Sequence, residues 1–133
     1  VMRPVDERLC RKTGHATGSA VHELVRLRSG QGEPLMIETS YLPVKRFPSL
    51  DIERLENGSL YDFLTAAYGF EIHNARETLR PVMPLPQEKE LLQITGTLPC
   101  ILLERFTYEN GACAEYTKSI VRGDKYIFSV ELK

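Results

Sequence analysis

The sequence has no tryptophan, and its 133 residues include only three cysteines, Cys10, Cys100 and Cys113. An odd number of cysteines without C-x-x-C spacing predicts neither a disulfide framework nor a zinc site. No apolar stretch is long enough to span a bilayer, and no signal peptide opens the chain. We therefore expect a cytoplasmic protein with no membrane association, no bound metal and no cofactor.

The sequence also lacks an excess of charge of either sign. Lys and Arg total 17 and Asp and Glu total 18, for a net charge of −1, which argues against a nucleic-acid-binding surface on this chain. A hydrophobic content of 42% is typical of a single domain with a real core. Because the chain opens at Val1 rather than Met, we interpret it as a fragment of a longer protein.

Hydrophobic periodicity and turn residues predict three helices and six strands. Asp6 and Ser59 are natural N-caps, and Gly69 and Gly96 are expected to end helices. The expected helices are 6–11, 59–68 and 86–94. The expected strands are 20–28, 35–42, 71–80, 100–108, 113–121 and a half-buried last strand, 126–132, with hairpin turns at 29–33 and 109–111 and a further turn at 122–124.

The chain also resembles itself in part. The segment from Gly18 through Arg26 to Pro34 is similar to that from Gly96 through Arg105 to Cys113. Each copy contains a short helix, a loop with glycine and a long hairpin. We therefore predict an α+β fold in which helices pack on an antiparallel sheet and two helix–hairpin halves are related by pseudo-symmetry.

One strand carries a candidate anion site. Arg26 and Arg28 are two residues apart, so they point to the same face, and the hairpin brings Glu38 into the same sheet. Two guanidinium groups on one face can bind a phosphate or a carboxylate. A solvated strand with surface ion pairs, or a structural Arg–Glu pair inside the sheet, would explain the same pattern.

Two other positions could contribute to a site. Ser59 opens a helix, whose N-terminus either binds an anion or is simply capped by the serine. Glu115 is expected to share a strand face with Cys113, Thr117 and Ser119. A half-buried carboxylate there needs a partner, either an arginine or a hydroxyl or amine of a ligand.

Six motifs occur in an order that is specific. They are Arg26-Leu27-Arg28, Gly32-Glu33-Pro34, the segment from Glu38 to Pro43 with Phe47-Pro48, Gly58 to Tyr61, Glu115 to Ser119, and Arg122 to Phe128. Together they resemble the UTRA effector-binding domain of GntR-type bacterial transcription regulators, in the HutC subfamily. The resemblance runs over nearly the whole chain, so residues 1–133 are expected to form one such domain.

The resemblance implies a chorismate-lyase-like fold and a homodimeric repressor that senses a small anionic metabolite, with a sugar phosphate as the favoured class. It implies that DNA is bound by an N-terminal winged helix-turn-helix, which we expect to lie before Val1 with the first strand of the family fold. By the same resemblance Arg26, Arg28 and Ser59 hold the phosphate, with Tyr61 close by. Glu38 and Glu115 hold hydroxyls or an amine, and Val121 replaces a tyrosine of many relatives.

Two alternatives remain open at this point. An enzyme on the same fold, a chorismate-lyase-like pyruvate eliminator, would also use an arginine-rich pocket. A dimerisation module with a vestigial pocket would use the alternating segment 126–132 as an interface edge. The regulator motifs favour the non-enzymatic sensor over both.

Overall fold

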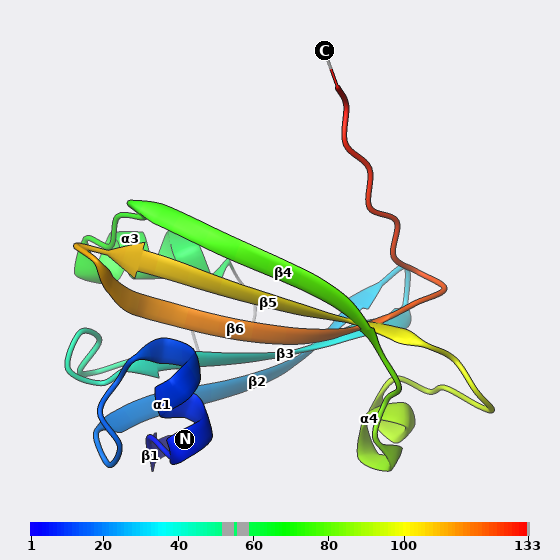
Figure 1. Ribbon diagram of the computed structural model, residues 1–133, viewed down its shortest axis with the longest axis horizontal. Helices are drawn as coiled ribbons and strands as arrows, with labels where there is room; N and C mark the ends of the chain where they lie inside the picture. Colours follow the sequence, from blue (N-terminus) through cyan, green and yellow to red (C-terminus); the bar gives the residue numbers. More distant parts are fainter. Residues whose placement is uncertain (52–54, 56–58, 133) are drawn as a thin grey trace.

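A six-stranded antiparallel sheet forms the centre of the molecule (Figure 1). The computed structural model describes residues 1–51, 55 and 59–132. The strand order is β1-β2-β3-β6-β5-β4, and each neighbouring pair is antiparallel. The strands are β1 (Met2–Pro4), β2 (Ala20–Gly30), β3 (Glu33–Pro43), β4 (Asn74–Val82), β5 (Cys100–Glu109) and β6 (Ala112–Arg122). The helices are α1 (Glu7–Thr13), α3 (Leu60–Tyr68) and α4 (Pro86–Leu91).

The order of elements repeats within the chain. The first half runs β1-α1-β2-β3 and the second runs β4-α4-β5-β6, with α3 between them. The two halves meet where β3 pairs with β6, so β1 and β4 occupy equivalent places at the two edges of the sheet. This arrangement confirms the predicted α+β fold with an antiparallel sheet, and its halves match the internal similarity of the sequence.

Two-residue turns close both hairpins. Gln31 and Gly32 have φ values of 54° and 79°, and Asn110 and Gly111 have φ values of 52° and 79°. Two consecutive positive φ angles define the turn that matches the right-handed twist of a hairpin. The second turn confirms the prediction for 109–111, whereas the first is tighter than predicted because β2 continues to Gly30 and β3 begins at Glu33.

The helices cover both faces of the sheet. In Figure 1, α1 lies in front of the sheet and α3 behind it. The core on the α3 face joins Leu24 and Leu42 of the sheet to Leu60 and Leu64 of α3. The α1 face has a separate core around Leu9, and Ile37 packs with the segment that follows α4 in a third cluster.

The predicted helix ends at Asp6, Ser59 and Gly69 are confirmed, whereas Gly96 does not end a helix because α4 already ends at Leu91. The side chain of Asp6 accepts a hydrogen bond from the N–H of Leu9 at 2.8 Å, and Ser59 accepts one from Asp62 at 3.3 Å. Gly69 ends α3 in the left-handed conformation, with φ of 64°. Because L side chains rarely adopt this conformation, glycine is favoured here. α4 is shorter than the predicted helix and ends at Leu91.

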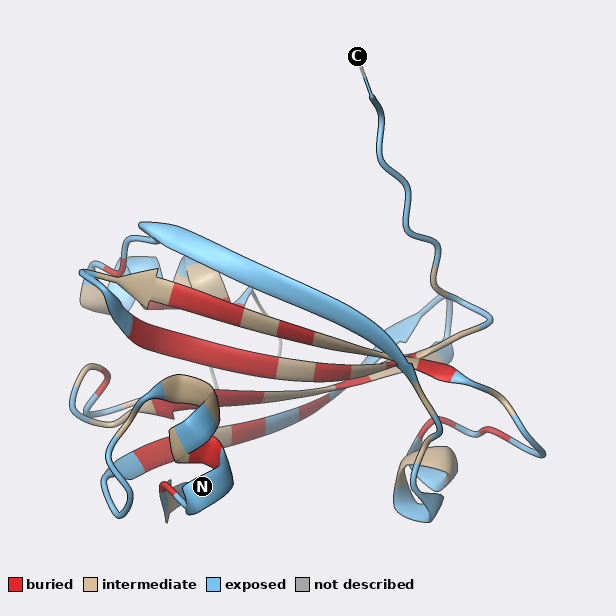
Figure 2. Cartoon of the chain, viewed as in Figure 1, coloured by how far each residue is buried: buried red, intermediate tan, exposed pale blue. Residues whose placement is uncertain are grey.

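The edge strand β4 differs from the prediction at both ends. It begins at Asn74 rather than Glu71, and it continues through Pro81 to Val82 in register with Cys100. Proline cannot donate to a sheet ladder, and an edge strand tolerates it because one side is unpaired. Figure 2 shows β4 almost wholly exposed beside buried central strands.

The predicted last strand, residues 126–132, is wrong. These residues form no strand, and they leave the body of the molecule as a tail in Figure 1. Ile127 is 91% exposed and Leu132 is 88% exposed. Alternation of apolar and polar residues favours a strand only where a sheet edge is available as a hydrogen-bonding partner. In the part of the chain that the structure describes, the tail pairs with no strand.

The remaining features of the described residues concern membrane spans, metal ions and cysteines. None of the helices described is long and apolar enough to cross a membrane. In the described part of the chain, no three His, Cys, Asp or Glu side chains lie together in a way that could hold a metal ion. Cys10, Cys100 and Cys113 are free thiols, and the last two are buried.

Candidate functional site

Each long hairpin carries one Arg–Glu pair on the α3 face of the sheet. In β2 and β3, Arg26 Nη2 lies 3.1 Å from Glu38 Oε2. In β5 and β6, Arg105 Nη2 lies 3.4 Å from Glu115 Oε1. Because β3 pairs with β6, the two ion pairs lie in the middle of one continuous sheet and follow its pseudo-symmetry.

Arg26 is a buried cation, with 8% of its surface exposed. Its Nη1 also donates to the backbone carbonyl of Leu55 at 3.3 Å. Burial lowers the pKa of the Arg26 guanidinium, the carboxylate of Glu38 opposes that effect, and the nearby charges of Arg28 and Arg105 add to it. Arg28 and Arg105 therefore both lie within electrostatic reach of Arg26, and an anion beside Arg26 would offset this repulsion.

Glu115 is the centre of a buried hydrogen-bond network. Its side chain is fully buried, and its Oε2 accepts from Tyr61 at 3.0 Å and from Thr107 at 2.9 Å. Oε1 accepts from Thr117, whose hydroxyl also pairs with that of Ser40 at 2.7 Å. A buried carboxylate is costly without such partners, so the hydroxyls and Arg105 explain how the sheet accommodates Glu115.

A bulge removes Cys113 from the face that Glu115 shares with Thr117. The register shifts between Thr107 and Tyr108, so that Thr107 faces Glu115 while Tyr108 faces Cys113. Cys113 therefore packs into the α1-side core, opposite to Glu115. The expectation that Cys113 shares a face with Glu115 is wrong, because simple alternation does not anticipate the extra residue of a bulge.

Tyr61 joins α3 to the sheet. It is the second residue of α3, the helix that Ser59 caps, and its hydroxyl reaches Glu115. The guanidinium carbon of Arg105 lies 4.8 Å from the centroid of the Tyr61 ring, within the range of a cation–π contact. Burial, followed by the charge of Glu115, raises the pKa of the Tyr61 hydroxyl, so it remains a hydrogen-bond donor at neutral pH.

Arg105 is the main residue that sequence reasoning missed as part of the site. Burial lowers the pKa of its guanidinium, but Glu115, Tyr61 and Glu77 together outweigh that effect and leave the pKa raised. Its buried Nε has no hydrogen-bond acceptor among the described residues. In the internal similarity of the sequence, Arg105 occupies the position equivalent to Arg26. This equivalence could have identified Arg105 as a site residue.

The other predicted site residues differ in their exposure and in the contacts they make. Arg28 is exposed and follows Arg26 on the same face. Ser59 caps α3, and Gly58, the first residue of the Gly58 to Tyr61 motif, falls outside the described residues. Val121 is 1% exposed and faces Met36 and Ile101 in the neighbouring strands. The structure thus brings Arg26 to Glu38 and Tyr61 to Glu115, and their roles in binding stay predictions.

This face presents both positively charged hydrogen-bond donors and negatively charged acceptors. Guanidinium groups can donate charge-assisted hydrogen bonds to a phosphate or carboxylate. Glu38, 18% exposed in its side chain, can accept hydrogen bonds from hydroxyl or amine groups. Guanidinium donors and carboxylate acceptors side by side are suited to binding a polar, charged ligand.

The fold and this face define a class of small-molecule-sensing domains built on an antiparallel α+β sheet. The chain belongs to the UTRA domain family, whose model matches residues 2–127. The HTH-type transcriptional repressor NagR of Bacillus subtilis is 31% identical over 123 residues, which cover 92% of this chain and 50% of NagR. The mannosyl-D-glycerate transport/metabolism system repressor MngR of Escherichia coli is 26% identical, covering 96% of this chain and 53% of MngR.

Solved structures agree with the family assignment. The crystal structure of the effector domain of PhnF from Mycobacterium smegmatis is similar with a TM-score of 0.88 and 26% identity, over 100% of this chain and 82% of that one. The resemblance seen in the sequence is thereby confirmed, and the named relatives are transcriptional repressors rather than enzymes. The chain spans about half the length of the curated relatives it matches.

Proposed function

We propose that this chain is the effector-binding domain of a cytoplasmic, homodimeric repressor of the GntR type and HutC subfamily. DNA would be bound by a helix-turn-helix domain that precedes residues 1–133 in the whole protein. The length of the relatives supports this proposal, because this chain covers 50% of NagR and 53% of MngR, both named as repressors. The near-neutral charge of the chain is consistent with DNA binding elsewhere.

The observation that supports the effector assignment is that Arg26, itself paired with Glu38, lies within electrostatic reach of Arg28 and of Arg105, which pairs with Glu115. We propose a small anionic metabolite, with a sugar phosphate as the favoured class. Arg26 and Arg28 would hold the phosphate with the hydroxyl of Ser59. A phosphate gains more from several guanidinium donors than a neutral sugar does, because hydrogen bonds to charged groups are the stronger ones.

The remaining groups would orient the sugar end. Glu38 and Glu115 would accept hydrogen bonds from hydroxyls or an amine, with Tyr61 close to Glu115. Val121 cannot form a hydrogen bond through its side chain, so it would contribute shape alone. The name of the E. coli relative refers to mannosyl-D-glycerate, a compound that combines a sugar with a carboxylate. That chemistry matches the mixture of arginines and carboxylates on this face.

Effector binding would act on DNA through α3 and the hairpins. Tyr61 links α3 to Glu115, so a ligand that competes for Glu115 or Arg105 changes how firmly α3 is held to the sheet. A coupling of about 1–3 kcal/mol between effector and DNA is typical of allosteric proteins. The ligand must favour one arrangement of these contacts over another for any coupling to arise.

A thermal-shift screen of this chain tests the proposal. Phosphosugars, aminosugar phosphates, phosphonates and small carboxylates would be compared with the corresponding neutral sugars. A ligand that binds the folded state alone raises the melting temperature by mass action. We expect a rise with a phosphorylated compound that Arg28→Ala diminishes and Arg80→Ala, an exposed arginine of β4, leaves intact. A response to neutral sugars alone, or an equal response in Arg28→Ala, would contradict the anion site.

A further inference from the structure

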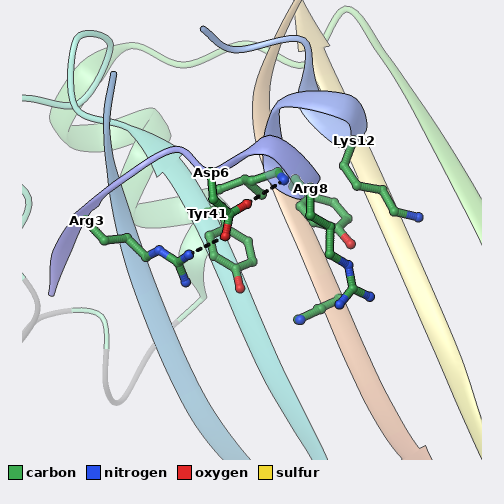
Figure 3. Close-up of a pocket in the computed structure, with 8 residues that line it drawn as sticks. Arg3, Asp6, Arg8, Lys12 and Tyr41 are labelled. Carbon is green, nitrogen blue, oxygen red and sulfur yellow. Dashed lines mark hydrogen bonds and ion pairs between the residues drawn. The ribbon is translucent and has the colours of Figure 1, made fainter. Parts of the chain in front are cut away.

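A basic pocket lies on the α1 face of the sheet, opposite the candidate effector site. Its volume is about 170 Å³, and its lining combines four cations, Arg3, Arg8, Lys12 and Lys118, with Tyr41, Tyr116, Leu9 and one carboxylate, that of Asp6. In Figure 3, Arg3 lies on one side of Tyr41, and Arg8 and Lys12 extend from α1 on the other. Tyr41 and Lys118 sit at strand positions adjacent to Ser40 and Thr117, which face the α3 side, so alternation places the pocket on the opposite face.

The floor of this pocket is rigid and aromatic. The rings of Tyr41 and Tyr116 stack at 5.6 Å with an interplanar angle of 14°, and Phe106 continues the stack at 4.8 Å from Tyr116. The hydroxyl of Tyr116 donates to Glu104 at 2.6 Å. Burial, aided by the carboxylate of Glu23, raises the pKa of Tyr41 to about 12. Both hydroxyls therefore stay neutral, and the floor adds no negative charge.

Carboxylates hold two of the cations in place, although only that of Glu104 is buried. Arg3 pairs with Glu23 at 2.8 Å and with Asp6 at 2.7 Å. Lys12 pairs with Glu104 at 3.0 Å, and the side chain of Glu104 is 8% exposed. These ion pairs fix positively charged groups on two sides of the pocket before any ligand arrives, which reduces the cost of ordering them on binding.

The other two cations have no such carboxylate. Neither Arg8 nor Lys118 forms an ion pair with any residue in the described part of the chain, although both line the pocket. Arg8 and Tyr116 line the same pocket, and the charge of Arg8 opposes the burial that raises the pKa of Tyr116. Two unneutralised cations facing one concave space attract an anion.

We propose that this pocket is a second anion site, which takes a phosphate-type dianion. Its volume corresponds to roughly five or six waters at about 30 Å³ each, which suits a phosphate group with its remaining hydration. Arg8 would supply a planar pair of donors, and Lys118 would supply a point charge from the sheet. Arg3 and Lys12 would add donors that their carboxylates leave unused. The site is independent of the effector assignment on the α3 face.

The test is an NMR titration of the ¹⁵N-labelled chain with inorganic phosphate, at ionic strength matched with sodium chloride. We expect saturable shifts of the backbone amides of Arg8, Lys12 and Lys118. The double variant R8Q/K118Q is expected to lose at least tenfold in phosphate affinity at these amides. Arg11→Gln provides a matched control, because Arg11 is an exposed arginine of the same helix, pairs with Glu7 and does not line the pocket.

The same signals separate this proposal from the effector site and identify the source of the phosphate. Shifts confined to Arg26, Arg28 and Arg105, or undiminished shifts in the double variant with a native spectrum, would overturn the proposal. So would the absence of any saturable shift. A second arm uses a mixed-sequence DNA duplex. Shifts with inorganic phosphate alone support the site for a free dianion, whereas duplex shifts that inorganic phosphate competes away would assign the pocket to singly charged backbone phosphodiesters and overturn the proposal.

Discussion

The hydroxyl of Tyr61 donates a hydrogen bond to Oε2 of Glu115 at 3.0 Å and thereby ties α3 to the β5–β6 hairpin. Glu115 is fully buried, so this bond matters to the fold as well as to the site. Removing a partner of a buried charge leaves that charge less well solvated, which costs more than an ordinary hydrogen bond contributes. The network that stabilises this domain is therefore the network that an effector would perturb.

Tyr61→Phe is expected to lower the free energy of unfolding by about 1.5–3 kcal/mol, the contribution of a hydrogen bond to a charged group, while Oε2 of Glu115 keeps its bond from Thr107. The ring and its contact with Phe70 are retained, so the loss of stability measures the contribution of the hydroxyl alone. Chemical denaturation measures the effect. Tyr68→Phe is the control, because the Tyr68 ring packs on Phe47 without a hydroxyl bond to the described residues. Equal stability of the two variants would contradict the role of the Tyr61–Glu115 bond.

Arg105→Gln is expected to weaken an anionic effector by about 1.5–3 kcal/mol, the range for a hydrogen bond to a charged group. Glutamine can still donate a hydrogen bond to Glu115, which limits the damage to the fold. Calorimetric titration with a compound identified by the thermal-shift screen gives the affinity. Arg76→Gln is a matched control, because Arg76 stacks on the Phe106 ring at 4.7 Å on the opposite face. Parallel losses in both variants would remove Arg105 from the site.

Gly123→Ala is expected to destabilise the domain by about 1–3 kcal/mol, as overpacking of a tight site does. A Cβ at Gly123 would lie 2.1 Å from the carbonyl oxygen of Pro99, a backbone atom that cannot swing aside. Thermal unfolding measures the effect. Gly30→Ala is the control, because its Cβ would meet only the side chain of Leu35 at 3.7 Å. A melting temperature of Gly123→Ala equal to that of the control would contradict the close approach.

Glu109 makes stability depend on pH. Its Oε1 accepts from Arg46 Nε at 2.6 Å, and this bond lowers the pKa of Glu109 below 4.5, with burial opposing and the Glu71 N–H assisting. The folded protein therefore binds fewer protons than the unfolded chain in this range. The stabilisation is present above about pH 4.5 and is lost as the pH falls through the folded pKa.

Glu109→Gln checks this pH dependence by removing the titrating group. The free energy of unfolding of the variant is expected to fall less steeply than that of the native chain between pH 5 and pH 3, in the region where a carboxylate of ordinary pKa titrates. Urea unfolding at several pH values gives both slopes. Superimposable slopes would show that the Arg46–Glu109 pair contributes nothing to acid stability.

Much of the fold follows from local chemistry. Asp6 and Ser59 were predicted to cap helices because their short polar side chains reach the first free N–H groups, and both do so. The Asn110-Gly111 turn was predicted because this pair accepts positive φ angles, and it has them. Local rules succeed where the relevant partner lies a few residues away along the chain.

The errors arise where partners are distant in sequence. The tail 126–132 has the alternation of a strand, but no edge of its own sheet pairs with it. Cys113 was assigned to the wrong face because the bulge at Ala114 arises only when Cys113 pairs with Tyr108 and Glu115 pairs with Thr107. Arg105 was missed as a site residue because its neighbours Tyr61 and Glu115 come from α3 and β6. Each of these depends on tertiary pairing that a single sequence does not display.

The central claim is that the α3 face binds an anion through Arg26, Arg28 and Arg105. The most direct measurement is a pair of calorimetric titrations of this chain, one with the best phosphosugar of the screen and one with the same sugar without its phosphate. The account predicts that loss of the phosphate weakens binding at least tenfold and that Arg28→Ala reduces this difference. Equal affinities for the two compounds, or an unchanged difference in Arg28→Ala, would contradict it.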